Sequence, residues 1–454
     1  MAKAKKKESL SPEERLQAAL VPESEQPYPV PANWCWVRLG LLLYSSKEKT
    51  EEFSDIGIKY VGLEHMQKDS GIVAYASAEG VKSLKNVFHP QQILYGKLRP
   101  YLNKHDIATF DGVCSTDILV FNTTSATIPK FVNFFLDQDT FIEYAVLNSK
   151  GINLPRVSES VVLDAKCPLP PFAEQQRIVD RMESLFAKLD EAKQKAQDAL
   201  DSFETRKAAI LHKAFTGELT AQWRKEHGVG MESWETYELV ECFEIVSGIQ
   251  KTPARSPKDN PIPYLAVANV YRDKIDLSDI RYFEVTPEEI EKLKLQDKDI
   301  LIVEGNGSGN EIGRCAMWHN ELPLCIHQNH IIRMRNKTAD VLPEYVLYYL
   351  NSQVGRSVMQ ERAKTTAGLY NLSAGKVKTI PLAFASLDEQ IEIVRILDDL
   401  LVKEQQAKEA AEGVLDQIDL IQKAILARAF RGELGTNDPN EESAVELVKR
   451  ALSN

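Results

Sequence analysis

One segment occurs twice in this chain, as EQQRIVDRMESLF at residues 174–186 and as EQIEIVRILDDLL at residues 389–401. A second matching pair follows, with KAAILHKAFTGELT at residues 207–220 and QKAILARAFRGELG at residues 422–435. Internal similarity of this kind indicates that one structural unit is repeated along the chain.

The spacing of the two motifs is the same in both copies. Glu174 and Glu389 are 389 − 174 = 215 positions apart, and Phe215 and Phe430 are 430 − 215 = 215 positions apart. The intervening segment therefore has equal length in each copy, which is what two matched spacers need.

Both repeated segments predict long helices. Apolar residues recur at steps of three and four from Ile178 to Phe203, and again from Ile393 to Ile421 with one polar interruption. No proline interrupts either run, and the first helix would be on the order of 60 Å long at 1.5 Å per residue. A narrow apolar stripe on so long a helix needs a partner, so the sequence predicts that the two helices form an antiparallel coiled coil.

A region of mixed character precedes each helix and opens on a tryptophan. WCWVRL begins at Trp34 and WETYEL at Trp234. Further short matching segments follow in the same order in both copies, while the lengths and residues between them differ. Short apolar strands separated by turn residues predict compact domains with mostly antiparallel sheet. We therefore expect an α+β protein with two similar tandem domains, each followed by a long helix, in a pseudo-twofold arrangement.

The composition is that of an ordinary globular protein. The chain has 454 residues, 43% of them hydrophobic and 27% charged, with a net charge of −11. No apolar run approaches the roughly 20 residues of a membrane helix, and MAKAKKKESL at the start lacks the apolar stretch of a signal peptide. The cysteines form no C-x-x-C pair, which suits a reducing cytoplasm: Cys35, Cys114, Cys167, Cys242, Cys315 and Cys325.

ILIVEGNGSGNEIGR, at residues 300–314, has the glycines of a loop that could hold a phosphate or a methyl donor. A cofactor loop of that kind follows a parallel strand and opens a helix. The sequence after it contains Gly313, Asn320 and Pro323 and reads as a hairpin, so a flexible turn is the favoured interpretation. We find no motif for base methylation, nucleotide hydrolysis or DNA cleavage, and we predict no catalytic residue.

Two histidines, His327 and His330, lie three positions apart near a cysteine and superficially resemble metal ligands. Without a second ligand pair nearby, a zinc site is disfavoured, and we predict no metal. The favoured interpretation places one histidine in the core and the other at a strand edge.

Two loops at equivalent positions carry residues suited to nucleic acid. Arginine and lysine suit guanine edges and phosphates, and asparagine and glutamine suit adenine. Any one such residue is more often an ordinary surface residue, but the matched positions favour DNA contact. The candidates are Lys97, Arg99, Tyr101, Asn103 and Lys104 in the first copy, and Asn306, Ser308, Asn310, Arg314, Gln328 and Asn329 in the second.

The duplicated motifs resemble those of the DNA-specificity subunit of type I restriction–modification systems. They are PPFAEQQRIV with KAFTGELT, and ASLDEQIEIV with RAFRGELG, and the resemblance covers the chain from Trp34 to Leu434. The second copy has PLAF where the first has PLPP, which places only the start of its helix in doubt.

The resemblance implies a cytoplasmic, non-catalytic subunit for phage defence. Each domain would read one half of a split, asymmetric site on double-stranded DNA, and the helices would fix the spacer between the halves. Two methylation subunits would bind S-adenosylmethionine and restriction subunits would use ATP and Mg²⁺, so no cofactor is expected in this chain. The expected division is a flexible N-terminal arm at 1–30, target-recognition domains at 31–171 and 234–384, spacer helices at 172–218 and 385–434, a linker at 219–233 and an acidic tail at 435–454.

Further residues are assigned with this resemblance in mind. Lys150, Arg156, Lys376 and Lys378 are candidate phosphate anchors. Residues expected in the spacer helices and in docking of the methylation subunits are Glu174, Gln175, Ile178, Phe215, Glu389, Gln390, Ile393 and Phe430. Two rival interpretations remain, a fused methyltransferase and a purely structural coiled-coil scaffold.

Overall fold

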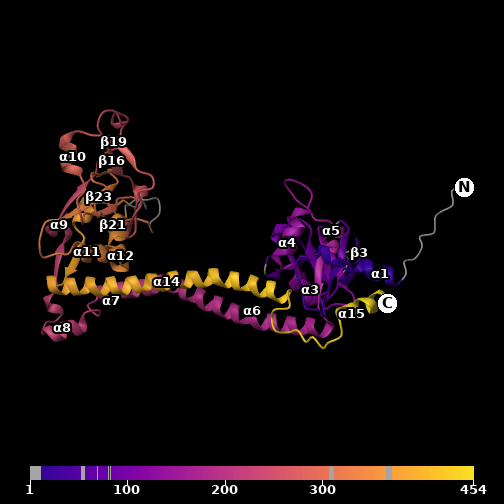
Figure 1. Cartoon of the computed structure of the whole chain (residues 1–454). Helices are drawn as coiled ribbons and strands as arrows, with labels where there is room; N and C mark the ends of the chain where they lie inside the picture. Colours follow the sequence, from indigo (N-terminus) through magenta and orange to yellow (C-terminus); the bar gives the residue numbers. More distant parts are fainter. Residues whose placement is uncertain are drawn as a thin grey trace. The chain divides into compact units, whose positions relative to one another are not determined.

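A computed structural model describes residues 12–52, 57–68, 70–79, 81, 83–305, 311–364 and 371–453. The chain divides into two compact units. Unit 1 comprises Met1–Ala196 and Gly413–Asn454, and unit 2 comprises Gln197–Glu412. Each unit therefore contains one mixed domain together with parts of two long helices, whose labels appear in Figure 1.

The described part of unit 1 contains short helices and short strands. The helices are α1 (Pro12–Ala19), α2 (Leu39–Leu42), α3 (Pro129–Leu136), α4 (Asp139–Leu147), α5 (Glu159–Asp164) and α15 (Ala444–Ser453), besides parts of α6 (Phe172–Asp201) and α14 (Leu387–Ala429). The strands are β1 (Cys35–Arg38), β2 (Leu43–Ser45), β3 (Lys49–Thr50), β4 (Lys59–Val61), β5 (Met66–Gln67), β6 (Gly71–Ile72), β7 (Ala76–Ser77), β8 (Lys85–Phe88), β9 (Ile93–Gly96), β10 (His105–Ile107), β11 (Gly112–Cys114), β12 (Ile118–Thr123) and β13 (Lys166–Leu169).

Unit 2 repeats this plan with different lengths. Its helices are α7 (Phe203–Phe215), α8 (Ala221–His227), α9 (Leu239–Cys242), α10 (Pro287–Leu293), α11 (Pro343–Asn351), α12 (Gln353–Ala363) and α13 (Ala374–Lys378). Its strands are β14 (Glu235–Glu238), β15 (Phe243–Ser247), β16 (Pro261–Leu265), β17 (Val270–Tyr271), β18 (Lys274–Ile275), β19 (Arg281–Glu284), β20 (Ile300–Val303), β21 (Cys315–Met317), β22 (Ile326–His327), β23 (Ile331–Asn336) and β24 (Pro381–Phe384).

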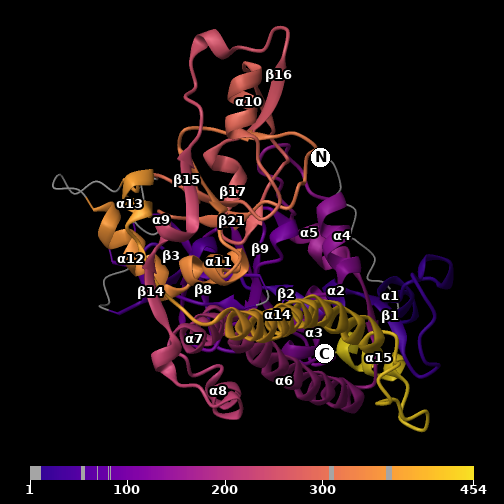
Figure 2. The same cartoon turned by 90° about the vertical axis from the view of Figure 1, so that its left-hand side faces the viewer.

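The sheet topology confirms that one fold is used twice. Unit 1 has a sheet in the order β10-β9-β12-β2 and a strand pair β1-β13, and unit 2 has β15-β23-β20-β21 and β14-β24. The strand pairs are antiparallel in both, except that β4 and β11, and β16 and β22, run parallel. In unit 2, β16 and α10 lie at the end remote from α7 in both views (Figures 1 and 2), and β19 lies beside them in Figure 1.

The long helices pack as antiparallel partners within each unit. In unit 1, Ile178 and Met182 from the start of α6 share a buried core with Phe430, which directly follows α14. In unit 2, Leu211 from the end of α7 shares a core with Ile393 from the start of α14. The start of one helix thus meets the end of the other in each case, which confirms the predicted antiparallel pair.

The first long helix is not continuous, contrary to the sequence prediction. It is interrupted at Ser202, between α6 and α7, whereas α14 runs unbroken for 43 residues. The Ser202 hydroxyl donates to the Ala199 carbonyl at 3.0 Å, and the Arg206 guanidinium donates to the same carbonyl at 3.3 Å. Side-chain donors to helix carbonyls compete with the backbone bonds and bend helices, and the apolar periodicity does not reveal this.

The N-terminal arm and the C-terminal tail are packed in their described parts. Helices α1 and α15 lie against each other, and Val21 donates its N–H to the Trp36 carbonyl at 2.8 Å. The tail is fixed by Arg177 of α6, which makes two 2.8 Å bonds to the Glu441 carboxylate. Residues 12–30 are therefore not the flexible arm that the sequence suggested, because their apolar side chains pack on the core of unit 1.

The glycine-rich segment after β20 does not lead into a helix. The chain returns as β21, which pairs antiparallel with β20. This confirms the predicted hairpin and differs from the strand–turn–helix order of a dinucleotide loop. Among the described residues, no helix combines the length and apolar character that crossing a membrane requires.

Candidate nucleic-acid interface

A tryptophan indole ties each domain to the helix that follows it. Trp34 Nε1 donates to Glu174 Oε2 at 2.7 Å in unit 1, and Trp234 Nε1 donates to Glu389 Oε2 at 2.9 Å in unit 2. Both carboxylates are completely buried. Buried carboxylates require several donors. Their additional donors come from the segment that follows the other long helix: Thr436 and Asn437 after α14 in unit 1, and Thr220 and Arg224 after α7 in unit 2.

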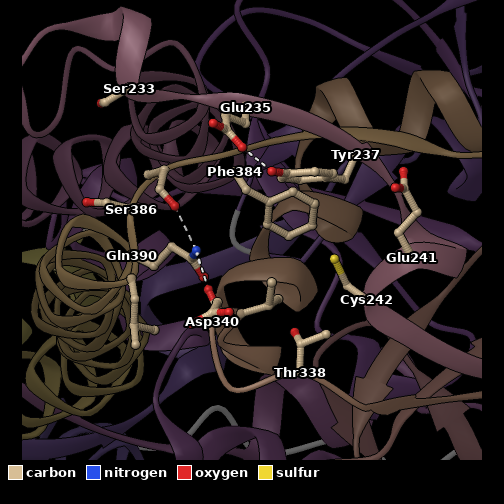
Figure 3. Close-up of a pocket in the computed structure, with 13 residues that line it drawn as sticks. Ser233, Glu235, Tyr237, Glu241, Cys242, Thr338, Asp340, Phe384, Ser386 and Gln390 are labelled. Atoms are coloured by element: carbon tan, nitrogen blue, oxygen red, sulfur yellow. Dashed lines mark hydrogen bonds between the residues drawn. The ribbon is translucent and has the colours of Figure 1, made fainter.

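The glutamine after each glutamate fixes the same junction through backbone groups. Gln175 Nε2 donates to the Ala126 carbonyl at 2.9 Å, and its Oε1 accepts from the Ile128 N–H. Gln390 Nε2 donates to the Ala385 carbonyl at 2.8 Å and to that of Asp340 (Figure 3). The repeated Glu-Gln pair therefore orients the helix on its domain.

Most residues expected to dock methylation subunits lie inside their own unit. Glu174, Gln175, Ile178, Glu389, Gln390, Ile393 and Phe430 are buried and Phe215 is partly buried. Docking through these side chains stays an untested prediction. The apolar residues that α14 does expose are Ile391, Val402, Val414, Leu420 and Ile421. The sequence interpretation placed Val414 and Ile421 in the apolar stripe and did not single out the other three.

In unit 1, the structure brings two separate candidate loops together. Arg99 donates its N–H to the Pro155 carbonyl at 2.7 Å, and the Val157 N–H donates to the Lys97 carbonyl at 3.0 Å. Lys150 and Arg156 exchange two backbone bonds, of 2.8 and 2.9 Å, across the base of the second loop. Four predicted cationic residues therefore stand on one hydrogen-bonded frame.

The backbone of the first loop is strained where it meets this frame. Arg99 has φ of 53° and Asn103 has φ of 40°, on either side of a 3₁₀ turn at Pro100–Leu102. Left-handed backbone in residues other than glycine costs of order 1–3 kcal/mol and persists where surrounding contacts hold it, commonly at functional sites. The bond from Arg99 to Pro155 is one such contact.

Two cations of the frame are free to meet an anion. The side chains of Arg99 and Lys150 make no ion pair or hydrogen bond with other residues that the structure describes. Arg156 is paired with Asp117 at 3.3 Å and stays exposed. Between Lys150 and Arg156, the loop tip presents Ile152, which is 100% exposed.

Not every first-loop candidate faces solvent. Tyr101 is half exposed, whereas Asn103 is buried and its amide donates to Asp137 at 3.2 Å. The ammonium of Lys104 donates to the Leu63 carbonyl at 2.7 Å. Asn103 and Lys104 therefore support the loop from within. Because both side chains are polar, the sequence did not indicate that they bond inside the unit.

Unit 2 keeps one backbone bond of this frame and has the opposite charge at one of its residues. Leu372 donates its N–H to the Glu304 carbonyl at 2.8 Å, the counterpart of the bond between Val157 and Lys97. Glu304 thus occupies the position of Lys97, and it pairs with His330 at 3.1 Å. The candidates Asn306, Ser308 and Asn310 lie outside the described residues.

Two of the remaining candidates of unit 2, Arg314 and Lys376, are engaged with their own unit. Arg314 is largely buried and donates to the Val267 carbonyl at 3.2 Å. Lys376 and Lys378 lie in α13 rather than in a loop, and the Lys376 ammonium donates to the Asn371 carbonyl at 2.9 Å. Gln328 and Asn329 are half buried beside β22.

One of the two histidines is buried and the other is exposed, as the favoured interpretation expected. His327 is completely buried and its Nδ1 lies 3.0 Å from the Ile331 carbonyl oxygen, while His330 is exposed. Burial lowers the pKa of His327 to about 4. Within the part of the chain that the structure describes, no group of three or more metal-ligating side chains converges.

The fold defines a protein with two similar α+β domains, each followed by a long helix. A family model for the "Type I restriction modification DNA specificity domain" matches residues 231–412. The chain is 29% identical over 333 residues to the EcoKI specificity subunit of Escherichia coli K12, covering 72% of this chain and 68% of that relative. It is 34% identical over 201 residues to the EcoDI specificity subunit of Escherichia coli, covering 44% and 45%.

Solved structures show the same fold. The TM-score is 0.68 to a chain from a structure of a type I R-M system and 0.64 to the HsdS subunit from Thermoanaerobacter tengcongensis. Both are 21% identical to this chain, and each match covers 90% of this chain and 100% of the other. The chain is therefore similar in sequence to type I restriction specificity subunits, and it shares the fold of these two solved structures.

Proposed function

We propose that this chain is the DNA-recognition subunit of a type I restriction–modification complex. Each domain reads one half of a bipartite, asymmetric site on double-stranded DNA, and the helix pair sets the spacer between the halves. The observation that carries the proposal is the frame in unit 1, where Arg99 and Lys150 present unpaired cations on a fixed backbone. Phosphate contacts of this kind supply most of the affinity for DNA.

The net charge of −11 is compatible with this role. Phosphate binding depends on a local cationic face, and a partner subunit can supply further positive charge. We infer that two methylation subunits with S-adenosylmethionine, and restriction subunits with ATP and Mg²⁺, provide the chemistry in the cytoplasm. This chain then needs no cofactor, metal or catalytic residue of its own.

Methylome sequencing tests the proposal directly. Cells that carry the complete system should show adenine methylation at one bipartite motif whose two halves differ. Exchanging residues 234–383 for those of a relative should change one half and leave the other intact. Absence of any bipartite motif would favour a scaffold, and methyl transfer by the isolated chain would favour a fused methyltransferase.

Inserting one helical turn, about four residues, between Leu189 and Phe203 tests the spacer separately. The preferred spacer should lengthen while both half-site sequences stay unchanged. An altered half-site would contradict the proposed division between reading domains and spacing helices.

A further inference from the structure

Strand β1 of unit 1 is covered along its outer edge by the N-terminal arm. Leu20 forms an antiparallel bridge with Val37, and the Val21 N–H donates to the Trp36 carbonyl at 2.8 Å. Trp36 Nε1 in turn donates to the Tyr28 carbonyl at 3.2 Å. The arm therefore adds extended backbone to the strand pair β1-β13.

The arm and the strand pair that it covers also carry opposite charges. The Lys166 ammonium lies 3.2 Å from a carboxylate oxygen of Glu25, and the Arg38 guanidinium lies 3.7 Å from the same carboxylate. Arg38 ends β1 and Lys166 begins β13, so a basic strand pair receives an acidic segment.

The equivalent strand of unit 2 has no such cover. β14 pairs with β24 as β1 pairs with β13, and Thr236 corresponds to Trp36. All four residues of β14 are exposed. No backbone group among the described residues bonds to the outer edge of β14 at Thr236.

Thr236 presents its backbone outward for a geometric reason. In a strand, the N–H and the C=O of one residue point to the same side, and the Trp36 carbonyl points away from β13 toward the arm. The same register gives Thr236 an outward N–H and C=O. An exposed edge of this kind is a template for strand addition, and native proteins normally cover or blunt it.

The surface beside this edge is a pocket with an acidic rim. Figure 3 shows Tyr237 and Phe384 on its wall with Glu235, Glu241 and Asp340 around them. Among the described residues, no lysine or arginine lines the pocket, and Lys337, which neighbours the lining residue Thr338 in sequence, donates to the Val240 carbonyl at 2.8 Å. Glu238 and Pro381 stand where unit 1 has Arg38 and Lys166, so the charge of the strand pair is reversed.

We propose that β14 and its pocket bind an extended, basic segment of a partner protein by strand addition. The occupant repeats the contact of the arm with β1, with a lysine or arginine opposite Glu238 in place of Glu25 opposite Arg38. An acidic rim repels phosphates, so this surface is separate from the DNA-reading face. The inference does not depend on which DNA sequence the chain reads.

Photo-crosslinking in cells that carry the complete system tests the inference. A benzoylphenylalanine in place of Tyr237 should crosslink to a lysine- or arginine-rich segment of another protein of the complex, identified by mass spectrometry of the crosslinked peptide. The same group in place of Tyr282, which is 49% exposed in the same unit, controls for nonspecific capture.

Thr236→Pro separates strand addition from simple proximity. Proline places its ring on the outer edge in place of the N–H and removes no bond to β24, so the domain should fold while an added strand no longer fits and the crosslink is lost. Thr236→Val keeps the N–H and should keep the crosslink. Glu238→Lys should also lose it by charge repulsion.

Each other outcome overturns the inference. These outcomes are an absent crosslink, one that persists in Thr236→Pro, one to an acidic segment, or one to a second copy of this chain. The methylation pattern of the same cells is read in parallel. A normal bipartite motif with no crosslink contradicts this inference and leaves the proposed function intact.

Discussion

In unit 1 the buried carboxylate of Glu174 accepts from Trp34, Thr436 and Asn437, all of them neutral donors, whereas in unit 2 Glu389 also holds the buried cation Arg224. The geometry of the junction is the same, but the electrostatics differ. Both copies of the repeat therefore place a buried carboxylate at the same position, but the residues that donate hydrogen bonds to it differ between the two units. The two junctions should therefore respond differently to the same substitution.

The largest expected difference concerns these two carboxylates. Glu389→Ala leaves the Arg224 cation buried without its partner, which should cost about 3–5 kcal/mol of unit 2 stability. Glu174→Ala leaves only neutral donors unpaired, which should cost unit 1 about 1–3 kcal/mol. Hydrogen exchange measured by mass spectrometry reports each unit separately. Equal losses in the two units would contradict the assigned role of Arg224.

Two buried histidines give the units opposite pH responses. Burial lowers the folded-state pKa of His327 to about 4, so its contribution to unit 2 is lost as pH falls from about 6.5 toward 4. The loss should reach up to about 3 kcal/mol. Burial also acts to lower the pKa of His105, but the charge and hydrogen bond of Asp137 and the bond of Asn133 outweigh it and raise the pKa.

The contribution of His105 is therefore complete below about pH 6.5 and is lost as pH rises through its raised pKa. Calorimetry between pH 4.5 and 8 should show unit 2 weakening toward acid and the His105 contribution to unit 1 weakening toward base. In His327→Leu, the stability of unit 2 should depend less on pH at the acid end of this range. In His105→Gln, the stability of unit 1 should depend less on pH at the basic end. The same change in the pH dependence of stability in both variants would contradict the opposite roles assigned to His327 and His105.

DNA affinity should distinguish free from engaged cations. Arg99→Ala with Lys150→Ala removes the two unpaired cations of the unit 1 frame, so the slope of log affinity against log salt should fall by about 2. Lys376→Ala should leave the slope unchanged, because its ammonium already serves the Asn371 carbonyl. The measurement uses the assembled complex and the motif found in the methylome. A reduced slope for Lys376→Ala would place that lysine on DNA.

The smallest expected effect concerns the exposed tip of the unit 1 loop. Ile152 is 100% exposed between Lys150 and Arg156, and burying a side chain of this size against DNA is worth about 1.5–3 kcal/mol at most. Ile152→Ala should weaken DNA binding several-fold without changing thermal stability. Val73→Ala, at a 46% exposed site of the same unit, is the control. Equal effects of the two variants would remove Ile152 from the interface.

Several features of the fold followed from the sequence because they rest on periodicity and length. The equal offset of 215 residues between equivalent motif positions predicted the repeat. Apolar residues at steps of three and four predicted two long helices, and their narrow apolar stripes suggested an antiparallel pair. The break at Ser202 was not predicted, because it depends on which carbonyl a side chain reaches in space.

The candidate site was predictable in part. Lys97, Arg99, Lys150 and Arg156 do converge, but their convergence depends on backbone bonds between loops about 50 residues apart. Burial was the main source of error. Asn103, like the repeated Glu-Gln pairs, lies inside, where its amide nitrogen donates to Asp137, a residue distant in the sequence.

The sequence by itself determined that one fold is used twice and that the long helices pair, because apolar spacing along a chain is a local property. The tertiary structure alone decided which polar groups are interior and which strand edge is left open. Within the described part of the chain, β1 is covered and β14 is not, although their registers match. That difference arises because the arm precedes only the first copy and folds back on unit 1, where it supplies a backbone donor to β1 and an acidic side chain to the basic strand pair.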